Sequence, residues 1–204
     1  MVLPTWSVAV GVDAVSPNVG GALDADLRMR PWVANLDHFP LRPGDWDVAA
    51  STVAQEAELV RQADDASSSD LEFEDALAEF EGEHFDADWS GLDLGVAGLV
   101  LALNAAGFAT ASSCRQHVGG QPFGDGPFVF LTGDVARIEL LVPLAVASGV
   151  GLEPGPPGEG FTVYAATIAE LMTLAASILT ARAEFQALPE TIGWDQDAYE
   201  DELD

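Results

Sequence analysis

The chain contains no lysine and only seven basic residues, all arginines, against 34 Asp and Glu residues. Its formal net charge is therefore −27. A protein that binds a polyanion neutralises phosphates with lysine and arginine, so this composition argues against nucleic acid as a partner. A high net charge of one sign favours solubility. It also fits an acidic surface that docks a basic protein, as in an immunity protein or a mimic of DNA.

Cysteine and long apolar runs are equally scarce. Cys114 is the only cysteine, so an internal disulfide is excluded. No stretch reaches the roughly 20 consecutive apolar residues of a membrane helix, and the start of the chain lacks the basic residues of a secretory signal. We therefore expect a soluble cytoplasmic protein with no membrane partner. The sequence indicates neither a cofactor nor an oligomeric state.

The acidic residues are unevenly distributed, which suggests four segments. Residues 64–93 carry twelve acids and no base, and residues 184–204 carry eight acids and no base. We expect residues 1–63 to supply N-terminal strands and a helix packed on the core. Residues 64–93 then form an acidic linker and a short helix, residues 94–183 an α+β core domain, and residues 184–204 an acidic disordered tail.

The core segment repeats an order of helix, strand and strand. Residues 95–106 are apolar nearly all round, as in a buried helix, and Gly107 ends that helix. Strands are expected at 108–113 and 127–132, followed by a helix from Asp134 to Ser148 that is kinked or broken at Pro143. Two more strands are expected at 151–152 and 161–165. A helix at 168–182 follows, opened by a Thr167–Glu170 capping box. The pattern predicts an α+β fold in which helix-strand-strand occurs twice before a closing helix, with a small sheet packed by helices.

The pattern outside the core is less regular. Strands are expected at 6–12 and 29–36, and residues 64–70 have a linker composition. A helix is expected from Asp45 to about Gln62, with a buried edge of Val48, Val53, Leu59 and Val60. An acidic helix is expected over 72–83, with a buried edge of Phe73, Leu77 and Phe80. Tryptophans outside the core, such as Trp46, suit either a partner surface or anchors that fasten the acidic segments.

Residues 110–120 gather most of the groups able to do chemistry, in the order Thr-Ala-Ser-Ser-Cys-Arg-Gln-His-Val-Gly-Gly. Arg115 or a protonated His117 beside Cys114 would lower the pKa of the thiol and make it a nucleophile, with His117 as general base. The opposite interpretation is a small buried cysteine at a strand end. Cys114 and His117 also have the spacing of one edge of a metal site. No further ligand stands at a diagnostic spacing, so we predict no metal.

The same segment has the composition of an anion pocket. Gly119 and Gly120 let backbone amides approach a ligand, while Ser112, Ser113 and Arg115 can donate hydrogen bonds to it. The alternative is a Gly-rich connection with Arg115 in solvent. These five residues are the candidate ligand-binding set, beside the candidate catalytic pair Cys114 and His117.

Residues 108–114, Phe-Ala-Thr-Ala-Ser-Ser-Cys, resemble the Thr-x-Ser-Ser-Cys signature of the wybutosine-pathway tRNA methyltransferase family. That family is α/β and uses S-adenosylmethionine. It continues Ser-Gly-Arg after the cysteine, where this chain has Arg115, Gln116 and His117, and the net charge opposes tRNA binding. From the resemblance we take only that Ser112, Ser113 and Cys114 form the edge of a pocket.

Composition and motifs together predict a protein that acts by binding. The partner is either a small anionic ligand at residues 112–120 or a basic protein at an acidic face. The alternative is an enzyme in which Cys114 is the nucleophile, His117 is the general base, and Arg115 or backbone amides hold an oxyanion.

Overall fold

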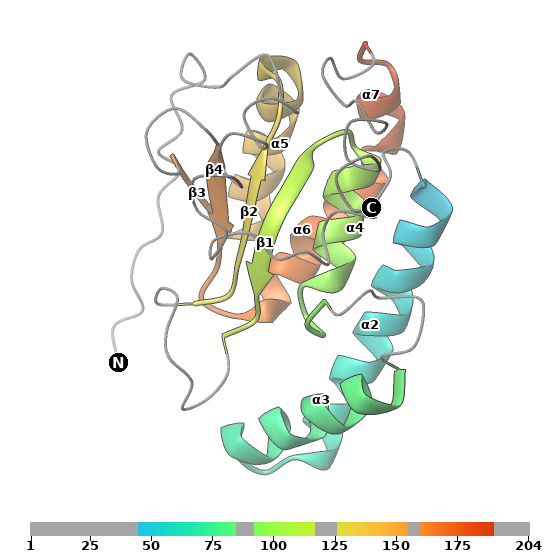
Figure 1. Cartoon of the computed structure of the whole chain (residues 1–204), viewed down its shortest axis with the longest axis vertical. Helices are drawn as coiled ribbons and strands as arrows, with labels where there is room; N and C mark the ends of the chain where they lie inside the picture. Colours follow the sequence, from blue (N-terminus) through green and yellow to red (C-terminus); the bar gives the residue numbers. More distant parts are fainter. Residues whose placement is uncertain (1–44, 85–91, 117–125, 155–159, 190–204) are drawn as a thin grey trace, which may run out of the picture.

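The computed structural model describes residues 45–84, 92–116, 126–154 and 160–189. Within these ranges the chain forms a four-stranded antiparallel sheet and six helices (Figure 1). The strands are β1 (Ala109–Cys114), β2 (Phe128–Thr132), β3 (Gly151–Pro154) and β4 (Phe161–Tyr164), and they lie in the order β1-β2-β4-β3. The sheet is therefore two successive hairpins joined through their second strands.

Three helices follow the predicted order around these hairpins. They are α4 (Ala97–Ala105), α5 (Val135–Ser148) and α6 (Ile168–Thr180), and they pack on the sheet and on one another (Figure 1). The element order α4-β1-β2-α5-β3-β4-α6 confirms the predicted α+β fold with helix-strand-strand repeated before a closing helix.

Local capping explains where these helices begin and end. Asp134 accepts a hydrogen bond from the Arg137 amide at 2.9 Å, and α5 ends at Gly149 in the left-handed region with φ 75°. The predicted capping box of α6 is present, with the Thr167 amide donating to Glu170 at 2.7 Å. The sequence predicts a kink or a break at Pro143. The helix is not broken there, because α5 continues through this exposed residue while the opposite side of the helix is buried. The closing helix ends at Thr180, and a short helix α7 (Arg182–Gln186) follows.

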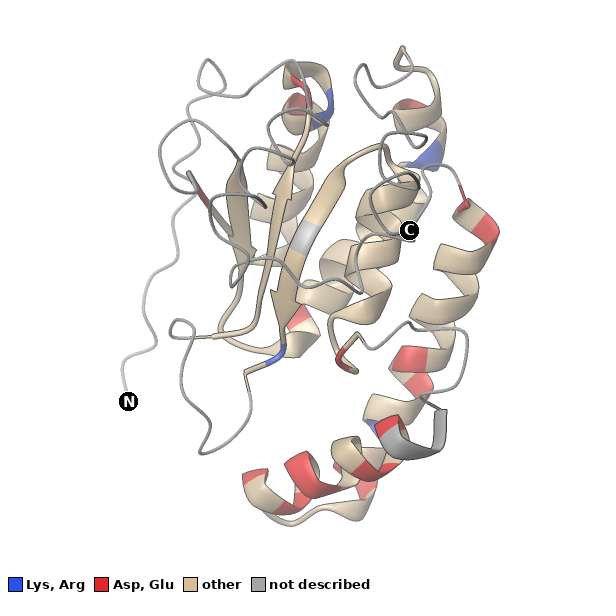
Figure 2. Cartoon of the chain, viewed as in Figure 1, with Lys and Arg blue, Asp and Glu red and all other residues tan. Residues whose placement is uncertain are grey.

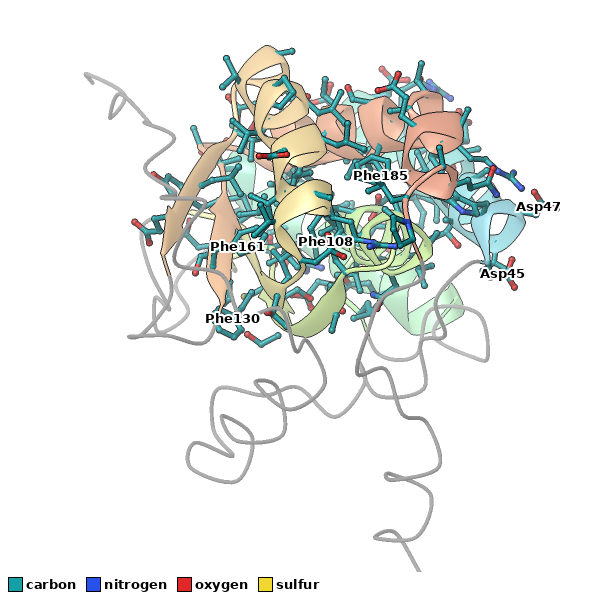
Figure 3. All side chains as sticks on the ribbon, turned by 90° about the horizontal axis from the view of Figure 1, so that it is seen from above. Asp45, Asp47, Phe108, Phe130, Phe161 and Phe185 are labelled. Atoms are coloured by element: carbon teal, nitrogen blue, oxygen red, sulfur yellow. The ribbon has the colours of Figure 1, made fainter. Side chains whose placement is uncertain are left out.

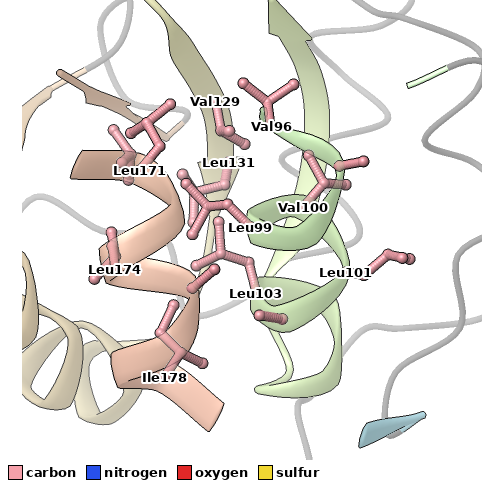
Figure 4. Packing of buried hydrophobic residues seen from close by; sticks show 14 of the residues in the cluster. Val96, Leu99, Val100, Leu101, Leu103, Val129, Leu131, Leu171, Leu174 and Ile178 are labelled. Atoms are coloured by element: carbon pink, nitrogen blue, oxygen red, sulfur yellow. The ribbon is translucent and has the colours of Figure 1, made fainter. Parts of the chain in front are cut away.

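The core lies between the sheet and helices α4 and α6. Leucines of α4 meet side chains of α6 and β2 (Figure 4), and the labelled residues include Leu99, Leu103, Val129, Leu131, Leu171, Leu174 and Ile178. Alternate side chains of β2 and β4 face the helices. Val129 pairs with Val163, and Leu131 pairs with Phe161, so these four side chains lie on the inner face of the sheet. The rings of Phe161 and Phe185 meet Phe108 edge-on, at centroid distances of 6.3 and 6.2 Å, whereas Phe130 lies on the other face of the sheet (Figure 3).

Helix α2 (Trp46–Ala66) packs on α4 and α6, and its buried side differs from the predicted one. The buried residues are Trp46, Ala49, Thr52, Glu56, Leu59 and Ala63. Of the four residues predicted to be buried, only Leu59 is. Val53 and Val60 are half-buried, and Val48 is 44% exposed. Trp46 is an anchor rather than a surface residue, with its ring 6.5 Å from that of Phe185.

Helix α3 (Asp70–His84) follows after a short connection and packs on α2. It matches the predicted acidic helix: Leu77 is fully buried, and Phe73 and Phe80 pack against the core. The residues expected as a linker are partly helical, because α2 continues through Asp64 and Asp65 and ends where the Ser67 hydroxyl donates to the Ala63 carbonyl at 2.6 Å.

None of the described helices is long and apolar enough to cross a membrane. The predicted strands at 6–12 and 29–36 and residues 190–204 of the predicted tail lie outside the described residues. The predicted start of a disordered tail at residue 184 is wrong, because residues 184–186 belong to α7 and Phe185 is buried against the core.

Candidate functional site

Arg115 follows β1 directly, and its side chain is only 2% exposed. Its Nη2 atom lies 2.8 Å from a carboxylate oxygen of Glu74, and its Nη1 atom pairs with Glu81. The backbone amide of Arg115 donates to the Asp93 carboxylate at 3.0 Å. Arg115 therefore lies inside the protein, with its charge balanced by two carboxylates of α3. We call Arg115, Glu74, Glu81 and Asp93 the Arg115 network.

The Arg115 network joins three segments that are distant in the sequence. Besides pairing with Arg115, Glu81 accepts a hydrogen bond from the Leu94 amide at 2.6 Å, just before α4. The network thus ties α3 to the end of β1 and to the start of α4. The Arg115 Nε atom is buried and makes no hydrogen bond. The guanidinium is held on its Nη side only.

Cys114 is half-buried at the end of β1, beside this network. Burial raises the pKa of its thiol above the ordinary value of 9.0, and the carboxylates of Asp93 and Glu74 raise it further against the opposing hydrogen bond from the Gln116 amide. Arg115 does not reverse this effect, because its charge faces Glu74 and Glu81. The thiol is therefore protonated at neutral pH, which weakens the nucleophile interpretation.

The two serines before Cys114 point to opposite faces of the sheet. Ser112 pairs with Phe130, whereas Ser113 pairs with the inward-facing Val129. Cross-strand partners share a face, so Ser112 and Cys114 lie on one face and Ser113 lies on the other. One pocket edge made by all three side chains is thus at odds with the strand geometry.

The rest of the candidate loop is not part of the described structure. His117, Gly119 and Gly120 lie in the gap between residues 116 and 126. The anionic ligand at residues 112–120 and the pairing of Cys114 with His117 therefore stay predictions.

The buried carboxylate of Glu56 is a site that sequence reasoning missed. It lies on α2, is 1% exposed, and accepts hydrogen bonds from the amides of Gly95 at 2.7 Å and Gly98 at 3.2 Å. The first amides of a helix have no partner within it, and Val96 offers no side-chain cap to α4. Glu56 caps α4 in its place. The signal in the sequence is a helix start, Gly-Val-Ala, without any capping residue.

Opposing forces act on the pKa of Glu56. Burial raises it, and the amides of Gly95, Gly98 and Ala97 lower it; burial dominates, and the pKa rises to about 7. Gly98 makes room for the carboxylate, because a Cβ atom there would lie 2.5 Å from the Glu56 Oε2 atom.

Acidic residues gather on α3 and on the C-terminal half of α2 (Figure 2). We call this region the acidic surface, and its exposed acids are Glu58, Asp64, Asp65, Asp70, Glu72, Asp75 and Glu79. Arg61 is the only base within it and pairs with Glu58 at 2.6 Å and Asp65 at 2.5 Å. Leu71 lies among these acids and is 60% exposed.

Comparison with known proteins gives no match: no family model fits the sequence, and no curated protein or solved structure is significantly similar to it. Across the described ranges, no three His, Cys, Asp or Glu side chains are grouped as metal ligands would be. The local resemblance of residues 108–114 to the wybutosine-pathway family stays a hypothesis.

Proposed function

We propose that the protein binds a cationic partner protein through the acidic surface. The observation that carries the proposal is the division of charge on α3. The inner acids Glu74 and Glu81 are offset by Arg115, while Glu72, Asp75 and Glu79 face solvent beside the exposed Leu71. The helix therefore presents uncompensated charge of one sign around an apolar side chain.

This arrangement is unfavourable for the isolated protein. Like charges three or four residues apart on a helix, such as Glu72, Asp75 and Glu79, destabilise it by about 0.2–0.5 kcal/mol per pair. Glu72 gains some compensation, because it accepts hydrogen bonds from the Ser68 amide at 2.7 Å and hydroxyl at 2.6 Å. A cationic partner would relieve the repulsion, and Leu71 would add an apolar contact inside a charged rim.

The described part of the cysteine segment supports the other two predictions less well. A thiol with a raised pKa is a poor nucleophile at neutral pH. A guanidinium held by two carboxylates has little charge left for an anionic ligand. Binding of a basic protein is therefore the prediction that the geometry favours.

The test compares two variants with the same loss of negative charge. The first is E72Q/D75N/E79Q on the acidic surface, and its matched control is D197N/E200Q/D201N in the C-terminal tail. The probe is a synthetic helical peptide with arginines four residues apart, titrated by calorimetry at two salt concentrations.

We expect the surface variant to lose about tenfold in affinity, which corresponds to about 1.4 kcal/mol. The tail variant should bind like the parent protein. Equal losses in both variants would show attraction by net charge alone and would refute the proposal.

A further inference from the structure

We infer that Arg115 is the positioning residue of the acidic surface: by holding Glu74 and Glu81 it fixes α3 on the core with its outer acids facing solvent. The importance of this role for binding rests on the proposed function. The docking of α3 itself is a separate claim and can be tested without any partner.

Helix α3 contacts the core through one apolar edge, formed by Phe73, Ala76, Leu77 and Phe80. Seven of its 15 residues are acids, and Leu77 is its only fully buried side chain among those described. The remaining sides of the helix are largely acidic, so its packing on the core depends on this single apolar edge. A polar attachment beside the edge would therefore add to the docking of α3.

The contacts of Arg115 supply that attachment. Glu74, Leu77 and Glu81 are spaced i, i+3 and i+7, so the two carboxylates flank the buried leucine along one side of the helix. Both carboxylates are largely shielded, at 16% and 15% exposed, and the guanidinium is at 2%. Removing one member of a buried charge network leaves its partners uncompensated, which is strongly unfavourable. Loss of Arg115 would remove the ion pairs of Glu74 and Glu81, and both carboxylates belong to α3.

The lone thiol provides a reporter beside the network. Cys114 is half-buried, and its pKa is raised partly by Asp93 and Glu74. If α3 leaves the core, Glu74 moves away from the thiol, its contribution to the raised pKa is lost, and the thiol reacts faster. If α3 stays while the arginine charge is lost, the charge of Glu74 acts more strongly on the thiol, and labelling slows. The direction of the change therefore separates the two cases.

The experiment uses the full chain and three variants. Arg115→Met removes the cation, and R115M/E74Q/E81Q removes the cation together with the carboxylates that it offsets. Arg182→Met is the matched control, because Arg182 pairs at 3.0 Å with a carboxylate, Asp47, that is 92% exposed. Hydrogen exchange of peptides from α3 to α6 and labelling of Cys114 are measured for each protein.

We expect Arg115→Met to raise exchange in α3 about 100-fold and to speed Cys114 labelling, while α4, α5 and α6 stay protected. The triple variant should return α3 exchange to within about tenfold of the parent. Arg182→Met should change neither readout. Unchanged α3 exchange in Arg115→Met, or a triple variant as exposed as the single one, would overturn the inference. Equal loss of protection in α4–α6 would also overturn it, since Arg115 would then hold the whole fold.

Peptide binding separates this inference from the proposed function. If both hold, affinity for the arginine peptide falls in Arg115→Met and recovers in the triple variant, whose outer acids are intact. If exchange behaves as expected but the parent protein does not bind the peptide, the proposed function fails and the positioning role stands.

Discussion

The substitution Glu56→Gln tests the capping role of the buried carboxylate on α4. Glutamine matches glutamate in size but has one oxygen and one NH2 group. In the parent protein both oxygens accept amide hydrogens, from Gly95 at 2.7 Å and from Gly98 at 3.2 Å. In the variant, the NH2 group of glutamine would face one of these backbone amides. Both groups are donors, so no hydrogen bond forms between them. We expect a loss of stability of about 1–3 kcal/mol at low pH, where the parent glutamate is also uncharged.

The pH dependence of this stability difference tests the raised pKa of Glu56 directly. The folded pKa of Glu56 is about 7, above the ordinary 4.5, so the folded state binds the proton more tightly than the unfolded state. The stabilisation from this proton is fully present below pH 4.5 and is lost as the pH rises to 7. The total change is about 3 kcal/mol, and it is absent in the glutamine variant. The advantage of the parent protein over Glu56→Gln should therefore shrink by that amount from pH 4.5 to 8.

Urea unfolding followed by circular dichroism, at half-unit steps between pH 4.5 and 8, measures this difference. Subtracting the two proteins removes the contributions of the other carboxylates. Glu58→Gln on the same helix is the control, because Arg61 and Gln62 lower the pKa of Glu58 to about 2, outside the window. A difference that is constant with pH, or that grows as the pH rises, would show that the amides of α4 outweigh burial, so that the pKa of Glu56 is not raised in the folded protein.

Three further predictions concern the core and the thiol. Gly98→Ala should lower the free energy of unfolding by about 1–3 kcal/mol, because the new Cβ meets the Glu56 carboxylate at 2.5 Å and a Val53 methyl at 2.9 Å; an unchanged urea midpoint would show that the carboxylate moves aside freely. Leu103→Ala, at a fully buried position in α4, should cost about 2–5 kcal/mol in the same assay, whereas a loss below about 1 kcal/mol would mean that α6 closes the gap. Cys114 should react with a thiol reagent at pH 7.5 more slowly than a free cysteine peptide, since its pKa is raised; faster labelling would revive the nucleophile interpretation.

The sequence predicts the core well where local signals and the tertiary structure agree. Asp134 before α5, Gly149 after it, and the Thr167–Glu170 capping box are short-range patterns that need no knowledge of the rest of the chain. The helix expected in the nearly wholly apolar segment 95–106 is equally plain, because a helix of that composition is a buried one, and α4 spans Ala97–Ala105. Four strands and three helices follow in the expected order from such signals.

The misses on α2 and at Arg115 share one physical cause. The buried side of α2 includes Thr52 and Glu56, so apolar periodicity alone identifies the wrong valines. The burial of Glu56 depends on the free amides of α4, about 40 residues further along the chain. Arg115 likewise looks available to an anion until its carboxylates on α3 are known. A polar side chain is buried because of a distant partner, and sequence spacing does not reveal that partner.

The joining of two hairpins through their second strands has a consequence for the way the sheet assembles. The strands within each hairpin are closer in the chain than β2 and β4, whose pairs run from Leu131 with Phe161 to Phe128 with Tyr164. Pairing of β2 with β4 also requires closure of a loop that contains α5. This pairing has the largest entropic cost of the three and is expected to form most slowly. An isolated two-stranded hairpin is marginally stable at best in water. Pairing of β2 with β4 is thus the step at which two hairpins, each marginally stable alone, become one cooperatively folded sheet.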